Sequence, residues 1–270
     1  MWHRFLMHPI ERLRYVARAG GVDQTLLARE AADALSSLWG EPAELVNACR
    51  RIVHHHPYAG AIWTLVTRVL ISPDPLETAQ RFADLLAADL TSEQVASSLP
   101  ENAILSLIGW PDIAGSKLCE RPDISVRVLD AYGEGSGYAR NLMSQGVHVT
   151  ELPLTATGQA CATSDVVLIE AAAAGPDGIV TASSALAAAS TAKFFGVDVW
   201  VVVGEGRALP GPIFELIKRR LQNEDTLQAD EEYMPLSLAD AIIGPNGLSR
   251  SGFPMRADCP VASELLRPAF

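Results

Sequence analysis

Several common signatures of function are missing from this sequence. It contains no Walker loop, no HExxH motif and no Ser, His and Asp in the order of a known hydrolase triad. Its 4 cysteines lie far apart and form no CxxC pair, which argues against a zinc site and, without an export signal, against disulfides. We therefore expect reduced thiols and neither a metal nor a cofactor.

The chain is also short of positive charge and of long apolar runs. Its most apolar tract, residues 197–203, has the length of one strand and contains Asp198, so it does not predict a membrane span. Residues 1–6 lack the apolar stretch of a signal peptide, which predicts a cytoplasmic protein. The formal net charge of -11 argues against binding to nucleic acid or to anionic membranes.

The N-terminal part reads as helical from about residue 9 to residue 95. Apolar residues recur near helical spacing, and no β-rich run interrupts them. Pro42 stands near a predicted helix start, where its missing N–H is not needed. Three consecutive histidines, 54–56, point about 100° apart on a helix and cannot bind one metal ion together, so we expect them at a helix end or in a cleft. We predict a helical domain over residues 1–98.

From residue 99 onward, short apolar runs alternate with helical stretches. The predicted strands are residues 103–108, 125–129, 147–152, 166–169, 199–203 and 241–243, and the predicted helices are 113–120, 135–145, 157–162, 183–195 and 211–222. Such alternation implies right-handed crossovers and a mainly parallel sheet. We therefore predict an α/β protein in which a helical bundle is followed by a Rossmann-like, mainly parallel open sheet over residues 99–270, with a loop over 222–232.

Candidate site residues follow the predicted strands, because ligands bind such sheets at the carboxyl ends of the strands. Asp130 and Tyr132 precede three glycines in a G-x-G-x-G arrangement, and Arg140 lies on the helix that follows. Flexible glycines before a helix can bring backbone N–H groups to an anion, although a plain strand-to-helix turn has the same pattern.

Three further positions carry polar groups at strand ends. Glu170 is an acid, a base or a hydroxyl acceptor if it faces a ligand, and an exposed loop carboxylate otherwise. Ser183 and Ser184 open an Ala-rich helix, where they form a phosphate seat or simply cap the helix. Arg207 lies in a Gly-containing loop. Either this loop closes on a phosphate that Arg207 binds, or the Arg207 side chain is simply solvated.

At this point the sequence resembles a known family. Residues 165–172 read D-V-V-L-I-E-A-A, Asp177-Gly178 follows, and a helix closes with A-K-F-F-G-V at 192–197. These pieces are similar to the strand end D-x-V-L-V-G-A-D, the N-G turn and the helix end A-A-K-x-x-G-V of the initiation factor 2B alpha, beta and delta subunits. That family also contains methylthioribose-1-phosphate isomerase and ribose-1,5-bisphosphate isomerase.

Other segments agree with the same family in order and spacing. Residues 126–137 with Gly146-Val147 resemble its second strand and helix, and H-P-Y-A at 56–59 with Trp63 resembles its R-P-T-A-x-N-L-x-W helix. The similarity spans about residues 44 to 247. It implies a helical domain followed by a Rossmann-like domain, and chains that pair as homodimers through their C-terminal domains.

The sequence departs from the family where the isomerases do their chemistry. The stretch that corresponds to their catalytic T-H-C reads L-S-L-I-G-W at 105–110, and their catalytic Asp falls on Ala172. Their N-K-x-G-T becomes T-A-S-S-A at 181–185. Proton relay between sugar carbons needs an acid/base pair, which these residues do not supply.

These departures favour a non-catalytic or regulatory protein that binds a phosphorylated sugar or nucleotide. In that hypothesis Arg140 and Arg207 meet the phosphate, and Ser183 and Ser184 cap it. Glu170 and Asp130 hold the hydroxyl groups of the ligand, and Tyr132 is a further candidate ligand-binding residue. The alternative is an aldose–ketose sugar-phosphate isomerase with relocated groups, in which Glu170 is catalytic. A third possibility is an interaction subunit that has no ligand.

Overall fold

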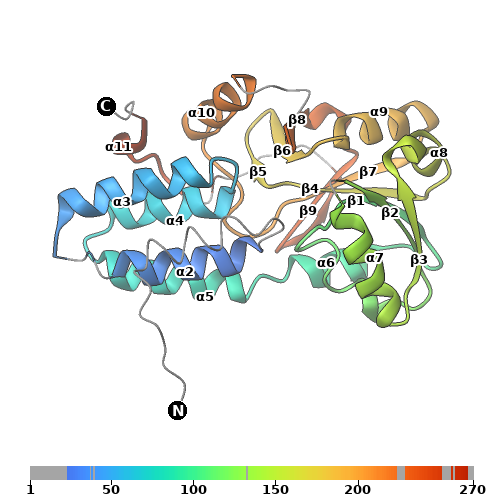
Figure 1. Cartoon of the computed structure of the whole chain (residues 1–270), viewed down its shortest axis with the longest axis horizontal. Coiled ribbons are helices and arrows are strands. Elements are labelled where there is room, and N and C mark those ends of the chain that lie inside the picture. Colours follow the sequence, from blue (N-terminus) through green and yellow to red (C-terminus); the bar gives the residue numbers. More distant parts are fainter. Residues whose placement is uncertain are drawn as a thin grey trace, which may run out of the picture.

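The computed structural model describes residues 23–36, 38, 40–131, 133–223, 229–250, 257 and 259–266. Its N-terminal part is the expected helical bundle, which lies at one end of the molecule in Figure 1. The helices are α2 (Gln24–Ser36), α3 (Pro42–His55), α4 (Gly60–Ile71), α5 (Pro75–Ala87) and α6 (Thr91–Ser98). Helix α4 is apolar on almost every side and is therefore the buried centre of the bundle. No helix among the described residues is long and apolar enough to span a membrane.

The remainder of the chain builds the predicted open sheet. Its strands are β1 (Ile104–Ile108), β2 (Ser125–Asp130), β3 (His148–Pro153), β4 (Val166–Glu170), β7 (Asp198–Val202), β9 (Ala241–Gly244) and β10 (Gly247–Ser249). They lie in the order β10-β9-β7-β4-β1-β2-β3, and every pairing is parallel except that of β10 with β9. The fold class expected from the sequence is confirmed. The strand order reverses between β1 and β4, which is where ligands bind in sheets of this kind.

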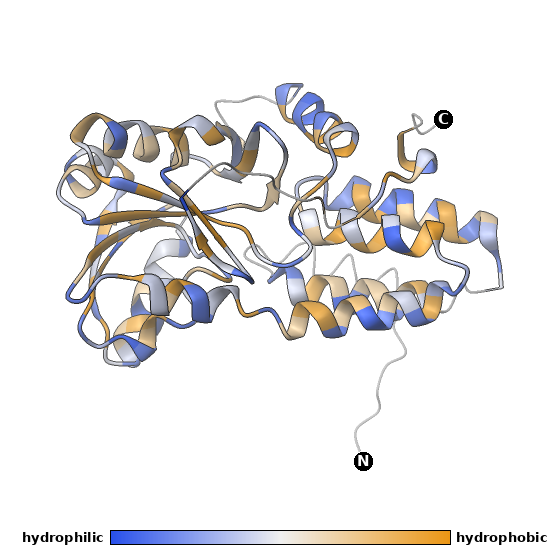
Figure 2. Ribbon diagram, turned by 180° about the vertical axis from the view of Figure 1, so that it is seen from behind, coloured by the Kyte–Doolittle hydropathy of each residue, from blue (hydrophilic) through white to orange (hydrophobic). Residues whose placement is uncertain are grey.

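Helices cover both faces of this sheet, and the central strands β1, β4 and β7 are buried and mostly apolar (Figure 2). On β4, Val167 and Ile169 face helices α8 (Thr157–Ala162) and α9 (Ala185–Phe195), whereas Val166 and Leu168 face α6 and α7 (Glu134–Ser144).

The structure also contains a second, antiparallel sheet that was not predicted from the sequence. It consists of β5 (Ala173–Ala174), β6 (Gly178–Ala182) and β8 (Glu231–Pro235), in the order β5-β6-β8. The predicted loop over 222–232 is therefore wrong at its end. The polar residues that open β8 have no alternating pattern, and β5 is too short to give one. The helix predicted over 113–120 is only the single turn η1 (Leu118–Glu120).

The C-terminal segment returns to the helical bundle. Cys259, Ala262 and Leu265 pack in the same apolar cluster as helices α2 to α5 (Figure 1). Helix α10 (Gly211–Gln222) joins that cluster through Ile213 and Phe214. Helix α6, in contrast, packs on the edge of the large sheet. A domain boundary at 98/99 stays a prediction, since buried cores connect residues from both sides of it.

Candidate functional site

A cavity of about 460 Å³ opens at the carboxyl ends of β1 and β4, where the helical bundle meets the sheet. Its lining comes from segments far apart in the sequence: residues 55–59 from the last residue of helix α3 onward, 107–112 from the end of β1 onward, 168–170 at the end of β4 with Ala172, and Thr181, Ala182 and Ala185 around the start of α9. Of the predicted site residues, the structure brings Glu170 and Arg207 together here. Both lie at the position that the strand-end rule predicts for a ligand site.

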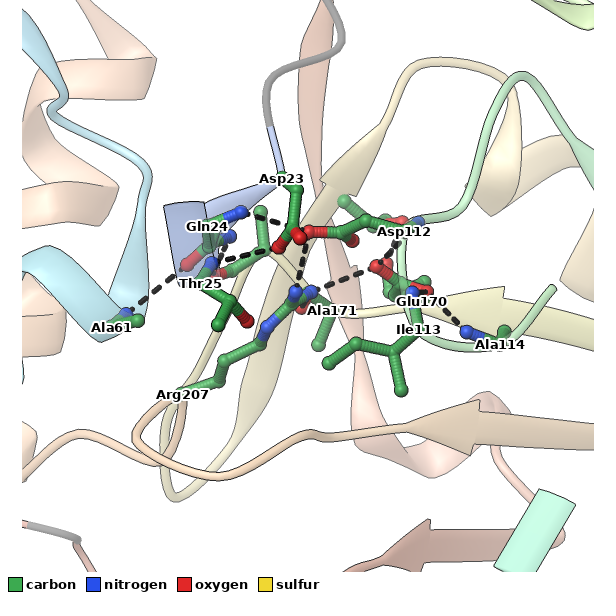
Figure 3. Close-up of polar contacts among 12 residues, drawn as sticks. Asp23, Gln24, Thr25, Ala61, Asp112, Ile113, Ala114, Glu170, Ala171 and Arg207 are labelled. Atoms are coloured by element: carbon green, nitrogen blue, oxygen red, sulfur yellow. Dashed lines mark hydrogen bonds and ion pairs between the residues drawn. The ribbon is translucent and has the colours of Figure 1, made fainter. Parts of the chain in front are cut away.

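A buried ion-pair network forms one wall of the cavity (Figure 3). The Arg207 guanidinium, 2% exposed, donates from Nη1 to Glu170 Oε1 and from Nη2 to Asp112 Oδ2, each over 2.8 Å. Nη1 also donates to the Ala171 carbonyl over 2.8 Å. Asp112 was not foreseen, although it follows the end of β1 and the strand-end rule alone singles it out. Arg207 is thus bound within the chain.

Glu170 is bound on both of its oxygens. Its Oε2 accepts the backbone N–H groups of Ile113 and Ala114 at 2.9 and 2.7 Å, and its Oε1 accepts that of Asp112 at 3.2 Å beside the Arg207 contact. A carboxylate has about four acceptor sites, so these four bonds engage the whole group. Glu170 therefore fixes the loop after β1 to the end of β4.

The two carboxylates of this network titrate differently. Burial opposes the ionisation of Asp112, but the charge of Arg207 and the hydrogen bonds outweigh it and hold the pKa of Asp112 well below its usual range. Burial and the nearby Asp112 carboxylate raise the pKa of Glu170, while Arg207 counters that rise. Because one guanidinium serves two acids, the network takes up a proton more readily than isolated carboxylates would.

Gln24, another residue that the sequence analysis missed, ties the network to the helical bundle (Figure 3). Its backbone N–H donates to Asp112 Oδ2 at 3.1 Å, and its side chain donates to the Ala172 carbonyl at 3.0 Å and accepts from Ala61 N–H at 3.1 Å. A lone glutamine at a helix start has no motif, so no sequence signal identifies this role.

The phosphate-binding site predicted at the start of α9 is occupied by a side chain of the protein. The Glu232 carboxylate accepts the Leu186 N–H at 2.7 Å, and hydrogen bonds from the N–H groups of Ser184 and Ala185 also act on its pKa, which burial raises. Ser184 has a φ of +81° and makes no side-chain cap, while the Ser183 hydroxyl donates to the Ala229 carbonyl. Neither serine lines the cavity, although their neighbours Thr181 and Ala185 do.

In the G-x-G-x-G segment, too, a carboxylate of the protein lies where the sequence predicts a ligand anion. Asp130 Oδ1 accepts the Ser136 N–H at 3.3 Å near the start of α7. Arg140 is exposed on α7 and does not line the cavity. Tyr132 lies outside the described residues. The structure therefore does not gather Asp130 and Arg140 with Glu170 and Arg207.

Two histidines line the cavity at the end of α3, consistent with the helix-end or cleft position expected for them. Burial and the neighbouring His55 lower the pKa of His56. The His56 Nε2 atom is buried and makes no hydrogen bond within the described chain.

Comparisons with known proteins agree on the fold. No model of a protein family matches the sequence, and no curated protein matches it. Among solved structures, the chain is similar to the translation initiation factor eIF-2B of Pyrococcus horikoshii OT3, with a TM-score of 0.73 and 14% identity over 90% of this chain and 96% of that chain. It is also similar to a chain of the tetrameric eIF2B-beta2-delta2 complex from C. thermophilum, with a TM-score of 0.72 and 16% identity over 89% and 90% of the two chains.

A third similar structure, eIF2B beta from Chaetomium thermophilum, has a TM-score of 0.66 and 16% identity over 90% of this chain and 86% of that chain. At such low identities the likeness concerns architecture. The resemblance seen in the sequence motifs is thus confirmed at the level of the fold: this chain has the fold of the translation initiation factor 2B subunits.

Proposed function

We propose that this chain is a non-catalytic or regulatory binding protein, and that its ligand lies in the cavity at the carboxyl ends of β1 and β4. The observation that carries this proposal is a cavity of about 460 Å³ beside a strand-end carboxylate, Glu170, whose oxygens are all engaged within the protein. A general acid or base needs an atom within reach of the substrate proton. The positions that match the catalytic Cys and Asp of the isomerases are apolar here.

The sequence resemblance implies a phosphorylated sugar or nucleotide as the ligand. The sugar or nucleoside part of such a ligand is supported by the carboxylates that line the cavity, Glu134, Asp230 and Glu231, which accept hydrogen bonds from hydroxyl and amino groups. Its phosphate is less well supported. The three places expected to bind it, Arg207 and the starts of helices α7 and α9, each hold a carboxylate of the chain.

A thermal-shift experiment tests the proposed function. The purified protein is melted with ribose 5-phosphate, ribose, AMP and adenosine over a range of concentrations. A ligand that binds only the folded state stabilises it by RT ln(1 + [L]/Kd), about 2.7 kcal/mol at 100 times Kd. We expect the melting temperature to rise with ribose or ribose 5-phosphate, and also with adenosine or AMP. Unchanged melting with all four compounds would count against a binding protein of this class.

An isomerase with relocated groups is the second candidate, favoured by one observation. Glu170 lines the cavity with a raised pKa, as a catalytic acid often does. If this candidate is right, the protein converts ribose 5-phosphate or another pentose phosphate, and Glu170→Gln abolishes turnover. Turnover that survives in Glu170→Gln would remove this residue from the mechanism. The cavity does not favour the third hypothesis, an interaction subunit without a ligand.

We also propose that the protein is cytoplasmic and forms a homodimer, as the sequence led us to expect.

A further inference from the structure

Trp110 lies at the edge of the cavity in an unusual setting. It lines the cavity, yet it is 46% exposed, whereas Trp63 and Trp200 are 6% and 2% exposed. A tryptophan ring carries a large apolar area, and leaving half of it in water forgoes much of the free energy that its burial would supply. The position therefore calls for an explanation that the packing of the fold does not give.

The structure holds this ring in place from behind. A Cβ atom at Gly137 would lie 3.0 Å from Cζ3 of Trp110, so the glycine makes room for the indole. The Tyr138 ring packs beside it, with ring centroids 5.7 Å apart. Tyr138 is itself wedged against Gly115, where a Cβ would lie 1.8 Å from its hydroxyl oxygen. Two of the glycines around helix α7 thus fit aromatic rings, and the indole is fixed before any ligand arrives.

The lining of the cavity is acidic. Among the described residues that form it, five carboxyl groups face one guanidinium and two histidines. Arg207 is shared between Asp112 and Glu170, so this network keeps a net negative charge when both acids are ionised. Glu134 and Asp230 both line the cavity, and burial and the charge of Asp230 raise the pKa of Glu134. An anionic ligand would meet like charge here.

We propose that Trp110 is the specificity-determining residue of the cavity, stacking on the ring of an unphosphorylated sugar, amino sugar or nucleoside. This inference rests on the proposed function and narrows its ligand class. A flat indole face binds sugar and base rings, and the carboxylates of the same cavity lining accept their hydroxyl and amino hydrogens. The same carboxylates disfavour the phosphorylated counterpart of each compound. A ligand with an amino group gains attraction both to the carboxylates and to the indole face.

Binding is tested with glucosamine, glucose and glucose 6-phosphate, and with adenosine and AMP, by calorimetry and by the change in tryptophan fluorescence. We expect affinity to fall from glucosamine to glucose to glucose 6-phosphate, and from adenosine to AMP. Loss of a stacking tryptophan costs about 1–3 kcal/mol, so Trp110→Ala should weaken binding roughly 5- to 150-fold. Trp110→Phe should retain part of the affinity and lose the fluorescence change.

Phe194→Ala is the matched control, since Phe194 is exposed on α9 and does not line the cavity. It should leave every affinity unchanged. Tighter binding of a phosphorylated compound than of its parent, or an unchanged affinity in Trp110→Ala, overturns the inference while leaving a binding function in place. If none of the five compounds binds the wild-type protein while ribose or ribose 5-phosphate raises its melting temperature, the inference fails and the proposed function stands. If no compound of either experiment binds, both fail.

Discussion

Arg207 is the residue whose removal should most disturb this protein. It is 2% exposed and forms ion pairs with two carboxylates that are largely buried. Arg207→Ala leaves Asp112 and Glu170 as uncompensated buried charges, and breaking such a pair costs about 3–5 kcal/mol. Arg207→Lys should be intermediate, because one ammonium cannot contact both acids as the guanidinium fork does. Denaturant unfolding followed by circular dichroism measures both variants.

Two further measurements make this expectation specific. Without Arg207 the folded-state pKa values of both acids rise above their unfolded values, so the folded state binds protons that the unfolded state releases as pH rises. The stability deficit of Arg207→Ala should therefore be larger at pH 8 than at pH 5. Arg140→Ala, an exposed arginine on α7, should change stability by less than about 0.5 kcal/mol. A deficit that does not depend on pH would contradict the charge argument.

At this scale the sequence was informative only in part. Glu170 and Arg207 were found because each follows a strand, and the strand-end rule needs no knowledge of contacts. Their ion pair was not foreseen, since it depends on β4 and β7 being neighbours in the sheet, which the sequence does not show. Trp110 and Asp112 were missed although they obey the same rule, because the first strand was judged by the catalytic residues that it lacks.

At the scale of elements, the close approach of helix α4 to the sheet depends on Gly60. A Cβ atom there would lie 2.9 Å from the carbonyl oxygens of Ala172 and Arg207, which are backbone atoms and have little room to move. Alanine favours a helix by about 1 kcal/mol over glycine. We nevertheless expect Gly60→Ala to destabilise the protein by about 1–3 kcal/mol, the usual cost of overpacking.

Gly158→Ala is the matched control for that substitution. Gly158 also lies in a helix, α8, and a Cβ atom there has no neighbour within 4 Å. This variant should be neutral or more stable by up to about 1 kcal/mol. Thermal unfolding of the two variants side by side separates helix propensity from contact. Equal effects in both would mean that α4 and the sheet do not meet as closely as described.

Helix α9 offers a second expectation at this scale. Its start is occupied by the Glu232 carboxylate, which replaces the phosphate that the sequence led us to expect there. Glu232→Ala should lower stability by about 1 kcal/mol, a typical cost of losing a cap. It should also free the N–H groups of α9, so that inorganic phosphate raises the melting temperature of this variant and not that of the wild type.

Glu232→Gln keeps an acceptor for those N–H groups and is the control. It should lose less stability than Glu232→Ala and should not respond to phosphate. A wild-type protein that is stabilised by phosphate as strongly as Glu232→Ala would show that the carboxylate does not occupy this seat. Sequence could not reveal the cap, because Glu232 is 48 residues beyond Ser184 and reaches it only through the pairing of β6 with β8.

For the whole molecule, the surface at the far end of helix α9 bears on assembly. Phe194 and Phe195 are 83% and 59% exposed, and their rings contact each other with centroids 5.1 Å apart. Helix α9 ends at Phe195 and β7 begins at Asp198, so this pair lies by the amino ends of the strands, opposite to the cavity. Adjacent exposed phenylalanines are typical of a surface covered by a partner.

We expect this surface to pair two copies of the chain. Light scattering after size exclusion should give twice the 28.9 kDa of one chain, and the double substitution Phe194→Glu with Phe195→Glu should give the monomer with unchanged circular dichroism. Leu26→Glu, at a similarly exposed position on α2, should leave the dimer intact. Because the phenylalanines lie opposite to the cavity, the monomeric variant should bind small ligands with wild-type affinity. A wild type that is monomeric at tens of micromolar, or a double variant that stays dimeric, would place the interface elsewhere or remove it.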